Sequence, residues 1–187
     1  SVRAIVALFE RMGLNVLLAA PTGRAAKRMG ELCDRDAQTI HRMLGMTFND
    51  QTGEVTFTKG EKEPLEADAL IVDETSMVDL SLMRALLAAL RPGCRLVLVG
   101  DPDQLPSVGA GNVFAELIGS GIVPVTVLDE IFRQSKDSLI AYNAKFINEG
   151  NTKLYYGQDF VFMASNNQAE AAERIVARYC REIEESG

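Results

Sequence analysis

Two adjacent carboxylates follow an apolar run in "LIVDETSMVD", residues 70–79. At the end of an inner strand, the first carboxylate, Asp73, can hold Mg²⁺ on a phosphate, and the second, Glu74, can orient or deprotonate an attacking water. The same residues also fit a strand that ends at a polar position, with Glu74 opening a helix whose positive end favours an acid. The pair alone leaves both interpretations open.

A second polar loop follows the apolar run in "LVLVGDPDQLPSVGAGNVF", residues 96–114. The carboxamide of Gln104 can donate to a γ-phosphate oxygen and accept from water, so it can report which nucleotide is bound. An ordinary glycine and proline turn is the alternative explanation of this loop.

Apolar strands alternate with amphipathic helices along most of the chain. Hydrophobic periodicity predicts strands at residues 14–20, 68–73, 94–101 and 123–129, and helices at 2–12, 23–33, 37–44, 79–90, 110–119 and 136–149. This alternation implies βαβ crossovers and a three-layer, mostly parallel α/β fold. Ligands of such sheets bind at the carboxyl ends of the strands, so Asp73, Asp101 and Asp129 should gather at one edge.

Composition restricts the class of protein. The net charge of −7 argues against broad attraction to nucleic acid but leaves a local basic site open. Three widely spaced cysteines form no CxxC pair, and His41 is the only histidine, so neither a disulfide framework nor a histidine metal site is indicated. No apolar stretch approaches the roughly 20 residues that span a bilayer. We therefore expect a cytoplasmic protein with no membrane partner.

A set of motifs resembles the RecD/TraA-type superfamily 1 DNA helicases, which include the exodeoxyribonuclease V alpha subunit. In chain order "LLAAPTGRAAKRM" is similar to motif Ia, "TIHRMLG" to a DNA-contacting segment, "LIVDETSMVD" to motif II, "LVLVGDPDQLPSVGAG" to motif III and "LDEIFRQ" to motif IV. The resemblance implies a RecA-like sheet of the P-loop NTPase fold, with ATP and Mg²⁺ as cofactors.

The resemblance also assigns catalytic roles. Asp73 would coordinate Mg²⁺, and Glu74 would act as the catalytic base. Gln104 would sense the γ-phosphate and couple it to DNA, while Arg133 would stabilise charge on the γ-phosphate during hydrolysis. A surface salt bridge to the acidic pair of "LDEIFRQ" is the alternative role for Arg133.

The DNA-binding residues that the resemblance implies are Pro21, Thr22, Gly23, Arg24, Thr39 and His41. Small residues at a junction of strand and helix permit close approach of a DNA strand, and helix-start amides donate to phosphates. A group of basic residues in the same segment supports the DNA-binding assignment: Arg24, Lys27, Arg28, Arg35 and Arg42. Lys27 and Arg28 equally fit a solvated helix face, and His41 equally fits a buried, hydrogen-bonded ring.

A β-hairpin is predicted within residues 46–59, because two β-prone stretches flank the turn "NDQTG". RecD-type helicases carry a small hairpin, the pin, at this place, and it separates the strands of the duplex. Phe48 and Phe57 either stack on bases at the fork or pack the hairpin onto the domain.

The P-loop pattern GxxxxGK[ST] does not occur in the sequence. We therefore expect a fragment: residues 1–150 as a partial first motor domain and 151–187 as the start of a second. The loss of the P-loop strand should leave a gap with exposed apolar surface beside the strand at 94–101, and we expect self-association or rearrangement to cover that surface.

The parent protein would be an ATP-dependent 5′-to-3′ DNA helicase in recombination and repair, the fragment alone being inactive. Its partners would be single-stranded or forked DNA and subunits of an exodeoxyribonuclease V-type complex. A non-enzymatic DNA- or protein-binding scaffold with the helicase fold is the alternative. A different Mg²⁺-dependent phosphatase or ATPase is a third, which "TIHRMLG" and the hairpin disfavour.

Overall fold

The computed structural model describes residues 2–50, 53–128 and 138–186. Contacts divide the chain into two compact units, Ser1–Thr126 and Val127–Gly187, and each is considered by itself. The sequence places the domain boundary at residue 150 instead, and the assignment of the two motor domains stays a prediction. Within the described residues, no helix is long and apolar enough to cross a membrane.

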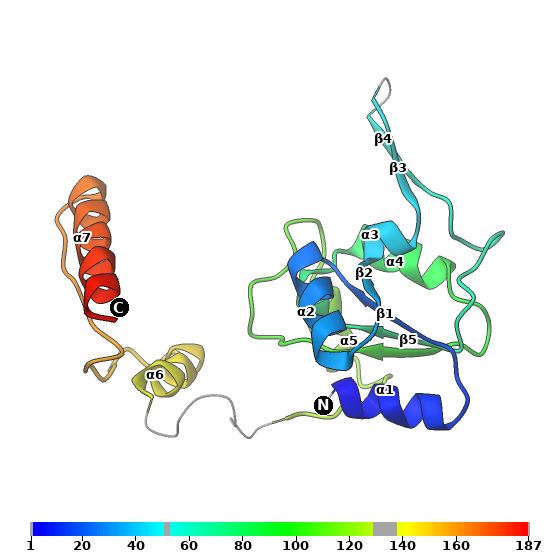
Figure 1. The fold of residues 1–187 in the computed structure, drawn as a ribbon, viewed down its shortest axis with the longest axis horizontal. Coiled ribbons are helices and arrows are strands. Elements are labelled where there is room, and N and C mark those ends of the chain that lie inside the picture. The colour runs from blue at the N-terminus through cyan, green and yellow to red at the C-terminus, as the bar shows by residue number, and fades with distance from the viewer. Residues whose placement is uncertain (1, 51–52, 129–137, 187) are drawn as a thin grey trace. The chain divides into compact units, whose positions relative to one another are not determined.

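A four-stranded parallel sheet forms the centre of the first unit (Figure 1). Its strands are β1 (Val16–Ala20), β2 (Ala37–Thr39), β5 (Ala69–Val72) and β6 (Arg95–Leu98), in the order β2-β1-β5-β6. All four residues of β5 are buried, because β5 has a neighbour on each side and helices over both faces. The predicted α/β fold class, with a mostly parallel sheet, is confirmed.

Helices cover both faces of this sheet: α1 (Val2–Arg11) and α2 (Gly23–Cys33) on one face, and α3 (Ile40–Met43), α4 (Leu80–Ala88) and α5 (Val113–Gly119) on the other. Successive side chains of β5 point to opposite faces. Ile71 packs with Leu18 and with α1 and α2, whereas Leu70 and Val72 pack with the other three helices. The three-layer arrangement follows from this alternation.

Two predicted elements are wrong. Residues 37–44 were expected to be one helix, but 37–39 form β2 and only 40–43 are helical. Parallel pairing with β1 outweighs the local helix preference of residues 37–39. Thr39 both pairs with Ala20 and caps α3. Residues 123–128 of the predicted strand 123–129 are not a strand, because no described segment pairs with them to complete their backbone hydrogen bonds.

The strand β6 is an edge strand among the described residues. Its apolar side chains Leu96, Val97 and Leu98 are only half-buried, unlike those of β5. Residues 123–128 are also exposed, with Val127 and Leu128 three-quarters exposed. The self-association or rearrangement that we expect to cover such surface stays a prediction.

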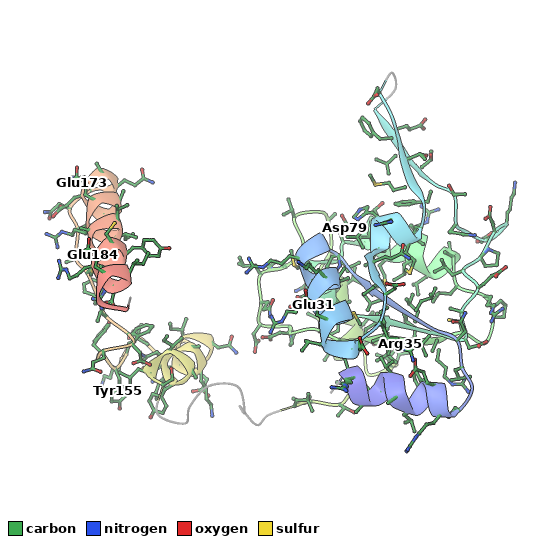
Figure 2. The ribbon with its side chains drawn as sticks, viewed as in Figure 1. Glu31, Arg35, Asp79, Tyr155, Glu173 and Glu184 are labelled. Carbon is green, nitrogen blue, oxygen red and sulfur yellow. The ribbon has the colours of Figure 1, made fainter. Side chains whose placement is uncertain are left out.

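Asp68 joins three strands at the edge of the sheet where they begin. Its Oδ2 accepts from the Asn15 N–H (2.8 Å), its Oδ1 accepts from Arg91 (2.8 Å), and its carbonyl accepts from the Arg95 N–H (2.9 Å). The Asn15 N–H bond, together with Arg91, lowers the pKa of the Asp68 carboxyl, because both favour its charged form. Arg35, which is labelled in Figure 2, forms an ion pair with Glu10 and so ties the segment after α2 to α1.

The predicted hairpin is confirmed as β3 (Met46–Asn49) and β4 (Glu54–Phe57), an antiparallel pair that projects from the unit (Figure 1). Phe57 packs against the core, while Phe48 is 57% exposed. The opposed pairs Met46–Phe57 and Phe48–Val55 make one face apolar. The other face carries Thr47 and Thr56, whose hydroxyls are 2.7 Å apart.

A neck closes the hairpin at its base. The Thr58 N–H donates to the Gly45 carbonyl (3.2 Å), and the Lys59 N–H donates to the Leu44 carbonyl (3.0 Å). Gly45 has φ +65°, and a Cβ there would lie 3.0 Å from the Thr58 side chain, so glycine suits this turn. Leu44 itself is buried in the core, which anchors the neck.

The second unit contains α6 (Leu139–Asn148) and α7 (Gln168–Ser186). Asp159 accepts from Ser138 Oγ and from the Leu139 N–H, both at 2.9 Å, where α6 begins. The Asn143 side chain is buried and exchanges two hydrogen bonds with the backbone of Tyr155, which lies beside α6 (Figure 2). These bonds fix residues 155–159 on α6.

Candidate functional site

The carboxylate pair lies at the carboxyl end of the central strand β5. The Asp73 N–H donates to the Ala19 carbonyl (3.0 Å), and Asp73 Oδ1 accepts from the Glu74 N–H (2.9 Å). Glu74 has φ 52° and ψ 40°, a left-handed conformation that is uncommon outside glycine and marks strain in a turn. Both residues are half-buried, so their carboxylates remain accessible to a ligand.

A single 3₁₀ turn, η1 (Thr75–Met77), follows the pair. The Thr75 N–H donates to the Val99 carbonyl (2.9 Å), and Thr75 Oγ1 donates to the Val72 carbonyl (3.2 Å). Ser76 is also buried, but no hydrogen-bond partner for its Oγ is present among the described residues. The turn is therefore fixed to the ends of β5 and β6 by Thr75.

The loop over residues 99–112, here called the Gln104 loop, is attached to this turn at one end and to the start of α4 at the other. At one end a Cβ on Gly100 would lie 3.1 Å from the Thr75 nitrogen. At the other end Gly109 packs directly on the Asp79 side chain, and the Leu80 N–H donates to the Ala110 carbonyl (3.0 Å). The loop and the carboxylate turn thus form one packed structure.

Gln104 lies in the exposed middle of this loop. Asp101 organises that part: its Oδ1 accepts from the Asp103 N–H (3.0 Å), and its carbonyl accepts from the Gln104 N–H (3.2 Å). Ser107 Oγ donates toward the carbonyls of both Gly109 and Gly111. The loop therefore presents Gln104 to solvent on a hydrogen-bonded turn rather than on an irregular strand of chain.

Asp79 is a further residue beside the site, because its side chain contacts Gly109 of the Gln104 loop. It is the N-cap of α4, and its Oδ1 accepts from the Leu82 N–H (2.8 Å) (Figure 2). The signal in the sequence is an aspartate three residues before Leu82 at the start of an apolar helix. Ser76, by contrast, has no signal in the sequence, because its lack of a partner depends on packing.

The predicted DNA-binding residues lie after β1 and β2, which end side by side because Ala20 is in register with Thr39. Thr22 Oγ1 accepts from the Ala25 N–H and caps α2, and Thr39 Oγ1 accepts from the Arg42 N–H and caps α3, both at 3.2 Å. Two helix starts therefore point to the same edge of the sheet, which is an arrangement suited to an anion.

The remaining DNA candidates surround these two caps. Pro21 is half-buried, Gly23 and Arg24 are exposed, and His41 is half-buried with its ring centroid 6.4 Å from that of Phe57. His41 thus lies between the core and the base of the hairpin. Lys27 and Arg28 are exposed on α2, with Lys27 near Glu31, which fits the solvated helix face.

The structure brings Asp73, Glu74 and the Gln104 loop together, but Asp129 and Arg133 lie outside the described residues. No group of three or more His, Cys, Asp or Glu side chains that could hold a metal ion is present in the described part of the chain. Mg²⁺ commonly takes one or two carboxylates together with phosphate and water. Asp73 fits that role, because its Oδ2 accepts no hydrogen bond from the described residues.

A family model described as "AAA domain" matches residues 1–177. The chain belongs to the AAA domain family. Membership of this family implies the use of ATP. The match includes the carboxylate pair, the Gln104 loop, both helix caps and the hairpin, so it covers the whole candidate site.

The AAA domain of this chain is similar to parts of known helicases. It is 38% identical over 181 residues to an ATP-dependent RecD2 DNA helicase of Deinococcus radiodurans, covering 97% of the chain and 24% of that protein. It is 43% identical over 120 residues to the RecBCD enzyme subunit RecD of Mycobacterium tuberculosis, covering 56% of the chain and 20% of that protein. The resemblance to RecD-type helicases that the motifs predicted is confirmed.

The fold has a solved counterpart in Bacteroides Pif1 bound to single-stranded DNA. That structure aligns with a TM-score of 0.54 at 23% identity, covering 91% of the chain and 48% of Pif1. It supports the α/β arrangement of the chain. The chain spans about a quarter or less of the length of the two curated relatives.

Proposed function

We propose that the chain is motor sequence of an ATP-dependent 5′-to-3′ DNA helicase of RecD type that acts in DNA recombination and repair. One observation carries this proposal most directly. The Asp73–Glu74 pair and the Gln104 loop are packed into one structure at the carboxyl edge of the sheet, and two capped helix starts lie at the same edge after β1 and β2. This arrangement supports a nucleotide site and a DNA-phosphate site at one edge of the sheet.

The residues of this edge divide the work of ATP hydrolysis. Asp73 would hold Mg²⁺, which supplies charge stabilisation on the phosphate oxygens when it is bound. The Glu74 carboxylate accepts the proton of the attacking water. Gln104, exposed on its loop, donates to the terminal phosphate or to that water. Arg133 would add a permanent positive charge at the same phosphate.

Single-stranded and forked DNA are the proposed nucleic-acid partners. The helix starts at Thr22 and Thr39 receive backbone phosphates, and Arg24 adds charge at the first of them. The hairpin acts as the wedge that separates the DNA strands. Phe48 lies at the fork, because it is exposed whereas Phe57 packs against the core. Similarity to a RecBCD subunit supports partner subunits of an exodeoxyribonuclease V-type complex.

The proposal is tested by measuring ATP hydrolysis by the full-length protein, with and without single-stranded DNA. We expect DNA-stimulated turnover that falls about 10²–10⁴-fold in Glu74→Gln, because the variant loses the base but keeps its shape. Glu116→Gln makes the same chemical change at an exposed position of α5 and should leave turnover intact.

Two results would contradict the proposal in different ways. A folded protein that binds DNA but hydrolyses no ATP would support the non-enzymatic scaffold. Turnover that DNA does not stimulate would support a different Mg²⁺-dependent ATPase.

A further inference from the structure

Ser76 carries a buried hydroxyl that forms no hydrogen bond within the described residues. The residue is only 5% exposed, and it lies two positions after Glu74 in η1. Buried hydroxyl groups nearly always have a partner, because leaving one unpaired costs the energy of removing it from water. An alanine at this position would avoid that cost, so the hydroxyl calls for an explanation.

Thr75, the neighbouring residue, shows that this turn can satisfy a hydroxyl. Thr75 is completely buried, and its Oγ1 donates to the Val72 carbonyl (3.2 Å). The two adjacent buried hydroxyls therefore differ in one respect: one has its partner in this conformation and the other does not. The comparison provides a matched pair for experiment.

A second costly feature lies in the same turn. Glu74 has φ 52°, a left-handed conformation that non-glycine residues rarely adopt. Strain and an unsatisfied polar group within three residues are what a turn with two alternative arrangements would show in one of them. Packed elements tend to switch between discrete arrangements rather than deform continuously.

The Gln104 loop is the segment that can supply the second arrangement. It touches η1 at Thr75 through Val99 and Gly100, and it touches the start of α4 at Asp79 through Gly109, while its middle is exposed. A ligand that draws Gln104 inward would therefore move the backbone that packs on η1. The Val99 carbonyl lies 2.9 Å from the Thr75 nitrogen, and a carbonyl oxygen has a second lone pair to which a hydroxyl can donate.

We propose that Ser76 is a positioning residue: its hydroxyl donates a hydrogen bond to a carbonyl of the Gln104 loop only when nucleotide is bound, and so couples that loop to Glu74. This inference rests on the proposed ATP-binding function. Ser76 does not touch the nucleotide itself. Part of the free energy of nucleotide binding would come from satisfying this one buried group.

The inference predicts effects of opposite sign for Ser76→Ala. Without nucleotide, the variant should unfold at a higher temperature than the wild type, because the unsatisfied hydroxyl is gone. Its affinity for a fluorescent, non-hydrolysable ATP analogue with Mg²⁺ should fall roughly 3- to 10-fold, the effect of one net hydrogen bond. Ser76→Thr keeps the hydroxyl and should restore affinity to within about twofold of the wild type.

The experiment uses the full-length protein, with thermal unfolding and analogue titration on the same samples. Thr75→Val is the matched control, because it removes a hydroxyl that already has a partner and should lower the unfolding temperature. A lower unfolding temperature for Ser76→Ala would overturn the inference, since the hydroxyl would then be partnered without nucleotide. Unchanged affinity in Ser76→Ala would also overturn it. A wild type that binds no analogue would overturn the proposed function itself.

Discussion

Replacing Gly109 by alanine tests the contact that holds the Gln104 loop against the start of α4. A Cβ at this position would lie 2.7 Å from the Asp79 Cβ and would also collide with the Asp79 carboxylate. Gly109 does not have a positive φ, so the alanine backbone itself is unstrained. Any loss of stability must therefore come from the collision.

The collision can be relieved in two ways, and each breaks a bond described above. If Asp79 turns away, α4 loses the cap bond to the Leu82 N–H, at a cost of about 0.5–2 kcal/mol. If the loop shifts, the bond from the Leu80 N–H to the Ala110 carbonyl is lost, at a cost of about 0.5–1.5 kcal/mol. We expect Gly109→Ala to lower the free energy of unfolding by about 1–2 kcal/mol.

Whether Gly109→Ala lowers or raises the free energy of unfolding shows whether the collision with Asp79 occurs. A glycine replaced by alanine in open space at an ordinary φ stabilises a protein by about 0.4–1 kcal/mol, because the unfolded chain loses freedom. Gly119 in α5 has nothing within 4 Å of its would-be Cβ, so Gly119→Ala serves as the control and should be stabilising. Urea unfolding followed by far-UV circular dichroism suits this chain, which contains no tryptophan.

A double-mutant cycle tests whether the Asp79 side chain is the group with which the new methyl group collides. Asp79→Gly removes the colliding atoms, and glycine is tolerated at an N-cap at a cost of only a few tenths of a kcal/mol, roughly. In that background Gly109→Ala should be neutral or stabilising. The reasoning is refuted if Gly109→Ala costs the same with and without the Asp79 side chain, because the loop would then be held elsewhere.

Three further outcomes are expected. The pKa of the Asp68 carboxyl is lower in the folded protein than in the unfolded chain, so ionised Asp68 stabilises the fold near neutral pH and this stabilisation is lost as pH falls through the folded-state pKa. The difference in urea midpoint between the wild type and Asp68→Asn should therefore become smaller from pH 7 to about pH 3. Phe57→Ala should lower stability because its ring packs on the core, whereas Phe48→Ala should leave stability unchanged and slow the unwinding of forked DNA. Burial raises the pKa of the Cys33 thiol, so a thiol reagent at neutral pH should modify exposed Cys180 first, as mass spectrometry would show.

Elements with a clear hydrophobic period were predictable from the sequence. The helix over 23–33 and the hairpin within 46–59 were placed correctly, because each has its own local pattern and end signals. The strand at 37–39 was missed because three residues carry no period, and only pairing with β1 makes them a strand. The strand expected at 123–129 shows the converse: an apolar run needs a neighbour to become a strand.

The sequence predicted the position of the candidate site but not its backbone conformation or its packing contacts. A carboxylate pair after an apolar run indicated a strand end, and the structure places Asp73 and Glu74 directly after β5. The left-handed backbone of Glu74, the unpaired hydroxyl of Ser76 and the packing of Gly109 on Asp79 are features of the folded turn and loop. Gly109 and Asp79 are 30 residues apart, and the other two features depend on packing, so no local sequence pattern predicts them.

The hydrogen-bonded neck at residues 44–45 and 58–59 makes the reach of the hairpin independent of the rest of the unit. Since the chain is already closed at the neck, lengthening the hairpin beyond it disturbs no strand of the sheet. Two residues added to each strand would extend the tip by about 7 Å and keep its apolar side on the same face. One residue added to each would extend it by about half as much but turn the tip residues over. The length of the hairpin can therefore be changed in steps of two residues, and for the proposed wedge role each step would change the distance between the sheet and the DNA fork.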